Sequence, residues 1–150
     1  MEFKPGCSPR FTMTLILLID DDLLIADLVT VSLANAGYIV GCLTDGQRAV
    51  EVIESKRPAL VLLDCAMPFV PGVEVLRRIR SSRTCFDVPV LMLTARASSI
   101  DRAIALRAGA TDYMAKPFDL DKLAATVDAM VDDSRACLKS ASAHSFARSR

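Results

Sequence analysis

The chain has 150 residues, 52% of them hydrophobic, and its 18 basic and 18 acidic side chains give a formal net charge of zero. This length favours one domain, and the composition excludes a disordered chain. No apolar run approaches the ~20 residues of a membrane span, and the N-terminus lacks a signal-peptide pattern, so we expect a soluble, cytoplasmic protein. Residues 14–133 carry 12 basic and 17 acidic side chains, which argues against direct binding of nucleic acid.

Apolar runs alternate with segments of helical spacing along the whole chain. Short apolar runs bounded by turn residues predict strands, and apolar residues three or four positions apart predict helices. In chain order, we expect strands near 14–19, 38–43, 59–64, 88–94 and 111–115, alternating with helices near 22–36, 45–56, 72–82, 98–108 and 119–132. Strands that alternate with helices indicate an α/β fold with a parallel sheet.

Cap residues and apolar spacing predict the ends and the buried faces of these helices. Aspartates stand where N-caps belong, and glycines stand where helices end: Asp22, Asp45, Asp119, Gly37 and Gly109. The predicted buried faces consist of Leu24, Leu28 and Val31 in the first helix, Leu76 and Ile79 in the third, and Leu123, Val127 and Met130 or Val131 in the last.

Two extensions flank the predicted domain of residues 14–133. Residues 1–13 show no clear pattern. Residues 134–150 are rich in serine and alanine, with four basic residues and no acidic one. This tail is expected to be flexible, or to continue the last helix and fray. Because the chain leaves no room for an output domain, we expect a stand-alone domain, with a fragment of a longer protein as the alternative.

Four of the predicted strands end in a charged or hydroxyl-bearing residue. Asp20, Asp21 and Asp22 follow the first strand, Asp64 ends the third, Thr94 the fourth and Lys116 the fifth, all at one sheet edge if the strands are parallel. Neighbouring carboxylates need a cation, and two or three acidic oxygens suit Mg²⁺ beside a phosphate. An aspartate flanked by a metal and a lysine can act as a nucleophile toward phosphorus. The set therefore fits phosphoryl transfer to a carboxylate.

With these residues in view, the chain resembles a response-regulator receiver domain of two-component signalling over residues 14–133. The resemblance rests on the acidic run Leu18 to Asp22, on the loop Asp64-x-x-Met67-Pro68-x-x-x-Gly72, on Leu93-Thr94-Ala95 and on Gly109 to Phe118. It implies a doubly wound five-stranded sheet of flavodoxin-like order 2-1-3-4-5, with helices on both faces.

The resemblance also implies roles for individual residues. Asp64 would accept the phosphoryl group, and Thr94 and Lys116 would contact it. Asp21, Asp64 and the backbone carbonyl of Ala66 would hold Mg²⁺ directly, with Asp20 acting largely through water. Thr94 and Tyr113 would form a switch pair. The family has a cis peptide bond before the proline that follows its lysine, here Lys116–Pro117.

In the family that the chain resembles, two variable positions influence the loss of phosphate, and here they hold Ala66 and Arg96, which depart from the better-known chemotaxis-type pattern. Ala66 has no polar side chain to orient an attacking water, and Arg96 is long enough to cover the phosphoryl group. We therefore expect slow loss of phosphate.

The resemblance implies partners for each surface. A histidine kinase or a histidine phosphotransfer protein would donate the phosphoryl group, facing the first helix and the loop around Phe118. A downstream protein, or a second copy of the chain, would meet the surface formed by residues 98–132. The chain would be a signalling protein and not an enzyme.

Two other interpretations compete with this one. A haloacid-dehalogenase-type phosphatase would use Asp20 as nucleophile and Asp22 as acid and base, with Asp132 and Asp133 as its last acids. Leu24 does not fit that motif, and the Asp64 loop would be idle. The other alternative is a phosphorylation-independent interaction module on the same fold, against which the intact acidic, threonine and lysine positions argue.

Overall fold

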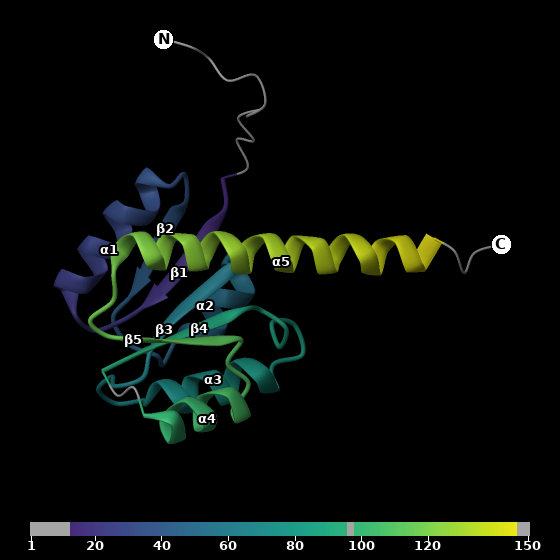
Figure 1. Cartoon of the computed structure of the whole chain (residues 1–150). Helices are drawn as coiled ribbons and strands as arrows, with labels where there is room; N and C mark the ends of the chain where they lie inside the picture. Colours follow the sequence, from purple (N-terminus) through teal and green to yellow (C-terminus); the bar gives the residue numbers. More distant parts are fainter. Residues whose placement is uncertain (1–12, 96–97, 147–150) are drawn as a thin grey trace, which may run out of the picture.

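The protein is a five-stranded parallel sheet covered by helices on both faces (Figure 1). The structure is a computed structural model that describes residues 13–95 and 98–146, with side chains described as far as residue 138. Its elements are β1 (Leu15–Ile19), α1 (Leu23–Asn35), β2 (Ile39–Leu43), α2 (Ala49–Lys56), β3 (Leu60–Asp64), α3 (Gly72–Ser81), β4 (Val90–Thr94), α4 (Ser99–Arg107), β5 (Asp112–Ala115) and α5 (Leu120–Phe146).

The strands lie in the order β2-β1-β3-β4-β5, which confirms the predicted fold class. The chain order reverses between β1 and β3, where open α/β sheets bind their ligands. In register, Ile19 pairs with Leu63 and Asp64 pairs with Leu93, so the carboxyl ends of these central strands are level. β3 and β4 are buried along their whole length, because helices cover both of their faces.

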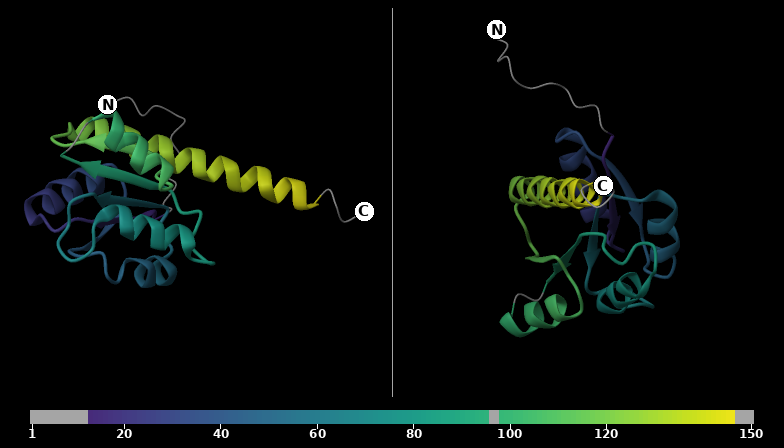
Figure 2. Two further views of the ribbon diagram at one scale, coloured as in Figure 1. Left: turned by 90° about the horizontal axis from the view of Figure 1, so that it is seen from below. Right: turned by 90° about the vertical axis from the view of Figure 1, so that its right-hand side faces the viewer.

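Alternate side chains of the strands enter two separate cores. The core on one face contains residues of α2, α3 and α4, and the core on the other contains residues of α1 and α5. Figure 2 shows these two groups of helices on either side of the sheet. Leu63 enters the first core and Leu62 the second, as the two-residue period of a strand requires.

Most of the predicted helix ends are present. The Asp22 carboxylate accepts the backbone N–H groups of Leu24 and Ile25, and Asp119 accepts those of Asp121 and Lys122. Helices α1 and α4 end just before Gly37 and Gly109, whose φ angles are 95° and 108°. The prediction that α2 begins at Asp45 was wrong, because Asp45 instead caps a turn that precedes Ala49.

The predicted buried face of α1 was also wrong. Leu24, Leu28 and Val31 are exposed, and the helix buries Ala26, Val29 and Leu33 instead. Apolar residues occupy several sides of this helix, so their spacing alone does not select the face that meets the sheet. The other predicted faces, on α3 and α5, are buried.

The last helix continues into the predicted tail, which is one of the two outcomes expected for residues 134–150. α5 does not end near residue 132 but continues to Phe146, so residues 134–146 of the predicted tail are helical, and Figure 1 shows this part of α5 extending past the sheet. Arg135 anchors it at the start of β1 by donating a 2.6 Å hydrogen bond to the Thr14 hydroxyl. In the part of the chain that the structure describes, no helix combines the length and the apolar character that a membrane span needs.

Candidate functional site

Acidic side chains from two neighbouring strands meet at the carboxyl edge of the sheet. Asp20 follows β1 and Asp64 ends β3, and they are only 2% and 5% exposed. Asp21 lies beside them and is exposed. One carboxylate oxygen from each of Asp20, Asp21 and Asp64 lies within 4.8 Å of the others. The structure thus brings together the three acids that the sequence singled out.

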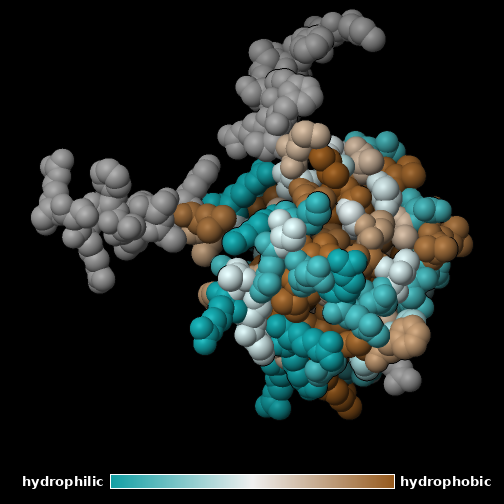
Figure 3. Space-filling view, turned by 180° about the vertical axis from the view of Figure 1, so that it is seen from behind, coloured by the Kyte–Doolittle hydropathy of each residue, from teal (hydrophilic) through white to brown (hydrophobic). Residues whose placement is uncertain are grey.

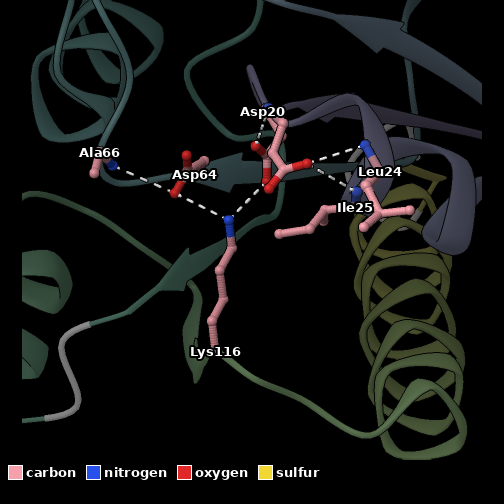
Figure 4. A network of polar contacts seen from close by, with 7 residues as sticks. Asp20, Leu24, Ile25, Asp64, Ala66 and Lys116 are labelled. Carbon is pink, nitrogen blue, oxygen red and sulfur yellow. Dashed lines mark hydrogen bonds and ion pairs between the residues drawn. The ribbon is translucent and has the colours of Figure 1, made fainter.

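The Lys116 side chain reaches these acids from the end of β5 (Figure 4). Its ammonium lies 2.8 Å from Asp20 Oδ2 and 3.3 Å from Asp64 Oδ1. Backbone groups also donate to both carboxylates: Asp22 N–H donates to Asp20 Oδ1 at 2.9 Å, and Ala66 N–H donates at 3.3 Å to Asp64 Oδ1, the oxygen that Lys116 also contacts. Each buried carboxylate therefore has both a cationic and a backbone partner.

The electrostatics of the pocket follow from burial and from this shared cation. Burial raises the pKa of the Asp64 carboxyl, and the charge of Asp20 adds to the rise, while Lys116 opposes it. For Lys116, burial lowers the pKa, but the hydrogen bond to Asp20 and the charge of Asp64 outweigh it and leave the pKa raised. Lys116 is thus held in its charged form between two acids.

The donor set of the acidic cluster fits a hard divalent cation. The three acids offer only oxygen ligands, and the exposed Asp21 leaves one side of the cluster open to water. Ions such as Mg²⁺ prefer oxygen ligands and keep several bound waters. The cluster can therefore hold a metal ion at the same edge at which Lys116 presents a positive charge.

Thr94 and Tyr113 lie together beside the acidic cluster. Thr94 ends β4 and is buried, and Tyr113 lies on β5 and is partly buried. Both side chains line a cavity of about 110 Å³, which Cys65 also lines. Burial raises the pKa of the Cys65 thiol and the neighbouring Thr94 side chain opposes the rise, a relationship that the sequence did not indicate. The backbone N–H of Lys116 donates to the Thr94 carbonyl at 2.6 Å and ties the ends of β4 and β5 together.

The loop after Asp64 packs tightly against the end of β3. Gly72 N–H donates to the Cys65 carbonyl at 3.0 Å, which closes the loop. A Cβ atom on Gly72 would lie only 2.1 Å from the carbonyl oxygen of Asp64, so the close approach requires glycine. This contact holds the loop, and with it the exposed Ala66, next to Asp64.

One further predicted feature belongs to a loop of this edge. The Lys116–Pro117 peptide bond is cis, the isomer that the resemblance implied. Arg96, expected to influence the lifetime of a phosphoryl group, lies outside the described residues.

The fold and this edge define a receiver of the response-regulator type. A family model for the response regulator receiver domain matches residues 16–128, and the chain belongs to that family. The chain is 44% identical over 116 residues to the response regulator MprA of Mycolicibacterium vanbaalenii, a match that covers 77% of this chain and 49% of MprA. It therefore spans about half the length of this curated relative.

Solved structures of receiver domains share the fold of this chain. The receiver domain of the Francisella response regulator 1452 is 26% identical, with a TM-score of 0.75, and the match covers 81% of this chain and 98% of that one. The receiver domain of the Pseudomonas aeruginosa sensor histidine kinase PA1611 is 34% identical, with a TM-score of 0.73, covering 79% of this chain and 98% of that one. That structure holds a magnesium ion in its active-site cleft.

Proposed function

We propose that this chain receives a phosphoryl group on Asp64 from a histidine kinase or a histidine phosphotransfer protein, in a two-component or phosphorelay system. The observation that carries the proposal is the position of the Lys116 ammonium, 3.3 Å from Asp64 Oδ1 at the edge of the sheet that also holds Asp20 and Asp21. Membership of the receiver family supports the same conclusion.

Asp21, Asp64 and the carbonyl of Ala66 would hold the Mg²⁺ that this reaction requires, and Asp20 would act on it largely through water. When bound, the ion would offset negative charge on the phosphoryl oxygens. The magnesium ion in the receiver domain of PA1611 supports this assignment.

The chain's own residues would carry the transfer. An Asp64 oxygen attacks phosphorus, the new O–P bond forms as the P–N bond of the donor phosphohistidine breaks, and the electron pair of that bond stays on the imidazole. Lys116 would stabilise one phosphoryl oxygen as a fixed charge, and the Thr94 hydroxyl would donate to another. Because the chemistry takes place on its own side chain, the chain would act as a signalling protein and not as an enzyme.

Phosphorylation would act on the rest of the protein through Thr94 and Tyr113. Movement of the Thr94 hydroxyl toward the phosphoryl group would vacate part of the cavity that it shares with Tyr113, and the ring would turn inward. The surface of residues 98–132 would change with it. Exposed Ile100 and Ile104 on α4 give that surface apolar contacts for a downstream protein or a second copy.

The phosphodonor would cover the other side of the pocket, along α1. Leu24 is 68% exposed, and Leu28 is also exposed. A hollow of about 250 Å³ lies between α1 and the start of α5, lined in part by Leu28, Phe118 and Lys116. An apolar helix face on the donor could bury these residues.

Neither alternative interpretation has comparable support. Asp132 and Asp133 lie within α5 and not at the end of a strand, whereas a phosphatase of the dehalogenase type would need acids at that edge. A phosphorylation-independent module would not require the cationic and acidic partners that surround Asp64.

The test is the intact mass of the protein after incubation with acetyl phosphate and Mg²⁺. The wild-type chain should gain one phosphoryl group, and Asp64→Asn should gain none. Asp20→Asn, which would lose all label in a dehalogenase-type enzyme, serves as the matched variant and should still gain some label. Complete phosphorylation of Asp64→Asn would refute the assignment of Asp64 as the phosphoacceptor. If no variant gains mass, binding of beryllofluoride, a phosphoryl mimic, decides whether a phosphoryl site exists at all.

A further inference from the structure

The loop between β3 and α3 turns the side chain of Phe69 outward, whereas Met67 and Val70 of the same loop are buried. Phe69 is 84% exposed, whereas Met67 and Val70 are buried in the core beneath α2 and α3. Exposed hydrophobic side chains occur elsewhere on the protein, as Figure 3 shows for one face, and exposure alone is not informative. Phe69 differs because Met67 before it and Val70 after it are buried, and these two residues fix its position in the loop.

The backbone at Phe69 is held in an unusual conformation. Its φ angle is 67°, in the left-handed region that bulky side chains rarely adopt. Val70 N–H donates to the Pro68 carbonyl at 2.8 Å and closes a three-residue turn around Phe69. The ring is therefore presented to solvent by a hydrogen-bonded turn.

This turn belongs to the loop that begins at the proposed phosphoacceptor. Asp64 ends β3, and the hydrogen bond from Gly72 N–H to the Cys65 carbonyl closes the loop beyond Phe69. Met67 and Val70 pack on the α2 and α3 side of the sheet, whereas α1 packs on the opposite side. Phe69 and the exposed leucines of α1 thus flank the acidic pocket from opposite sides of the sheet.

A protein that phosphorylates Asp64 must cover this rim. Asp64 is only 5% exposed. The histidine side chain of the donor protein therefore has to reach into the pocket, while the backbone of the donor protein lies on the surrounding loops. Three acids, one lysine and the Mg²⁺ that the pocket would hold carry no net formal charge, so the pocket gives little net attraction for an anionic phosphoryl group. Apolar contacts at the rim are then the natural source of binding free energy, and a rigid aromatic side chain is well suited to supply it.

We propose that Phe69 is a contact residue for the protein phosphodonor, which would touch Phe69 on one side of the pocket and the α1 leucines on the other. This inference rests on the proposed function. It assigns to the loop after Asp64 a part in donor binding, and it names the occupant of that surface as a histidine-bearing protein.

The experiment compares a protein donor with a small one. The protein donor is a purified, autophosphorylated histidine kinase core, chosen as one that phosphorylates the wild-type chain. The small donor is acetyl phosphate with Mg²⁺, which does not reach the rim. Phe69→Asn removes the ring but tolerates the positive φ angle, and Phe69→Tyr keeps the ring. Phe86→Asn is the matched control, because Phe86 is 54% exposed in the loop before β4, at the other edge of the sheet.

The quantity measured is kcat/KM with the kinase core divided by the rate with acetyl phosphate. For Phe69→Asn this ratio should fall by about tenfold, mainly through KM, as expected for the loss of one buried aromatic contact. Phe69→Tyr and Phe86→Asn should keep the wild-type ratio. An unchanged ratio in Phe69→Asn, or an equal fall in Phe86→Asn, would overturn the inference. If no histidine kinase core that phosphorylates the wild-type chain can be found and acetyl phosphate gives no label either, the proposed function itself is contradicted.

Discussion

The Lys116 ammonium lies 3.3 Å from Oδ1 of Asp64, although 52 residues separate the two in the sequence. The same nitrogen lies 2.8 Å from Asp20 on the neighbouring strand end. One cation therefore partners two buried carboxylates, at the position where an incoming phosphoryl group would need a positive charge.

Replacement of Lys116 should separate metal binding from phosphorylation. Lys116→Met removes the positive charge but keeps much of the side-chain volume, so the pocket becomes more negative. We expect Mg²⁺ to bind about tenfold more tightly, because the competing cation is gone. Phosphorylation by acetyl phosphate should slow by about a hundredfold, because a charge that stabilises the phosphoryl oxygens is lost. Calorimetric titration and intact mass measure the two effects, and weaker Mg²⁺ binding would contradict this account.

The raised pKa of Asp64 predicts that the charged form of this side chain lowers the stability of the folded protein, and that this loss depends on pH. Because burial and Asp20 raise this pKa in the folded state, the folded protein binds a proton that the unfolded chain has already released. Stability is then lost as the pH rises from the unfolded pKa, near ~4, through the folded one. In metal-free buffer, Asp64→Asn should be more stable than wild type at neutral pH, and the difference should disappear at acid pH.

Urea unfolding at a series of pH values, followed by circular dichroism, checks this prediction. Added Mg²⁺ should stabilise the wild type at neutral pH much more than it stabilises Asp64→Asn. A variant that is less stable than wild type at neutral pH would show that the Asp64 charge is favourable in the free protein.

Gly72 should be required for the closed loop. A Cβ atom there would lie 2.1 Å from the Asp64 carbonyl oxygen and 2.8 Å from the Cys65 Cα atom, both of them backbone atoms. We expect Gly72→Ala to lower the free energy of unfolding by about 1–3 kcal/mol and to slow phosphorylation, because the loop must shift. Gly41→Ala is the control, since its nearest neighbour would be a leucine methyl at 3.7 Å. Equal effects of the two substitutions on phosphorylation would count against the role of the loop.

Ala66 should set a slow rate of phosphate loss. Its methyl group cannot orient a water molecule against the phosphoryl group, whereas an asparagine amide could. We expect Ala66→Asn to lose phosphate several times faster than wild type, and Ala66→Val to show no acceleration. The decay of the labelled species, followed by intact mass after removal of the donor, gives these rates. The same decay rate in Ala66→Asn as in wild type would exclude this role.

The sheet and its functional edge could be predicted because their signals are local. The apolar runs of β3 and β4 have no polar interruption, and the residues that end each strand stand directly beside them in the sequence. Parallel strands then bring Asp20, Asp64 and Lys116 to one edge without further information. That Lys116 contacts both acids depends on side-chain reach across the sheet, which no spacing records.

Two helices show where the sequence signal was insufficient. In α1, apolar residues occur on several sides, so the choice of Ala26, Val29 and Leu33 for the core is made by packing against the sheet. In α5, the residues beyond 133 have little apolar periodicity, which left a flexible tail and a continued helix both open. The useful signal was the lack of any glycine or proline after Pro117, since without a helix breaker α5 can continue to Phe146.

Chemical trapping of the phosphorylated residue tests the central claim most directly. Borohydride reduces an aspartyl phosphate to homoserine, which marks the acceptor permanently. After treatment with acetyl phosphate and Mg²⁺ and then borohydride, peptide mass spectrometry should find homoserine at position 64 and aspartate still present at positions 20, 21 and 22. Omission of Mg²⁺ should abolish the conversion. Homoserine at position 20, 21 or 22, with Asp64 intact, would contradict the assignment of Asp64 as the phosphoacceptor.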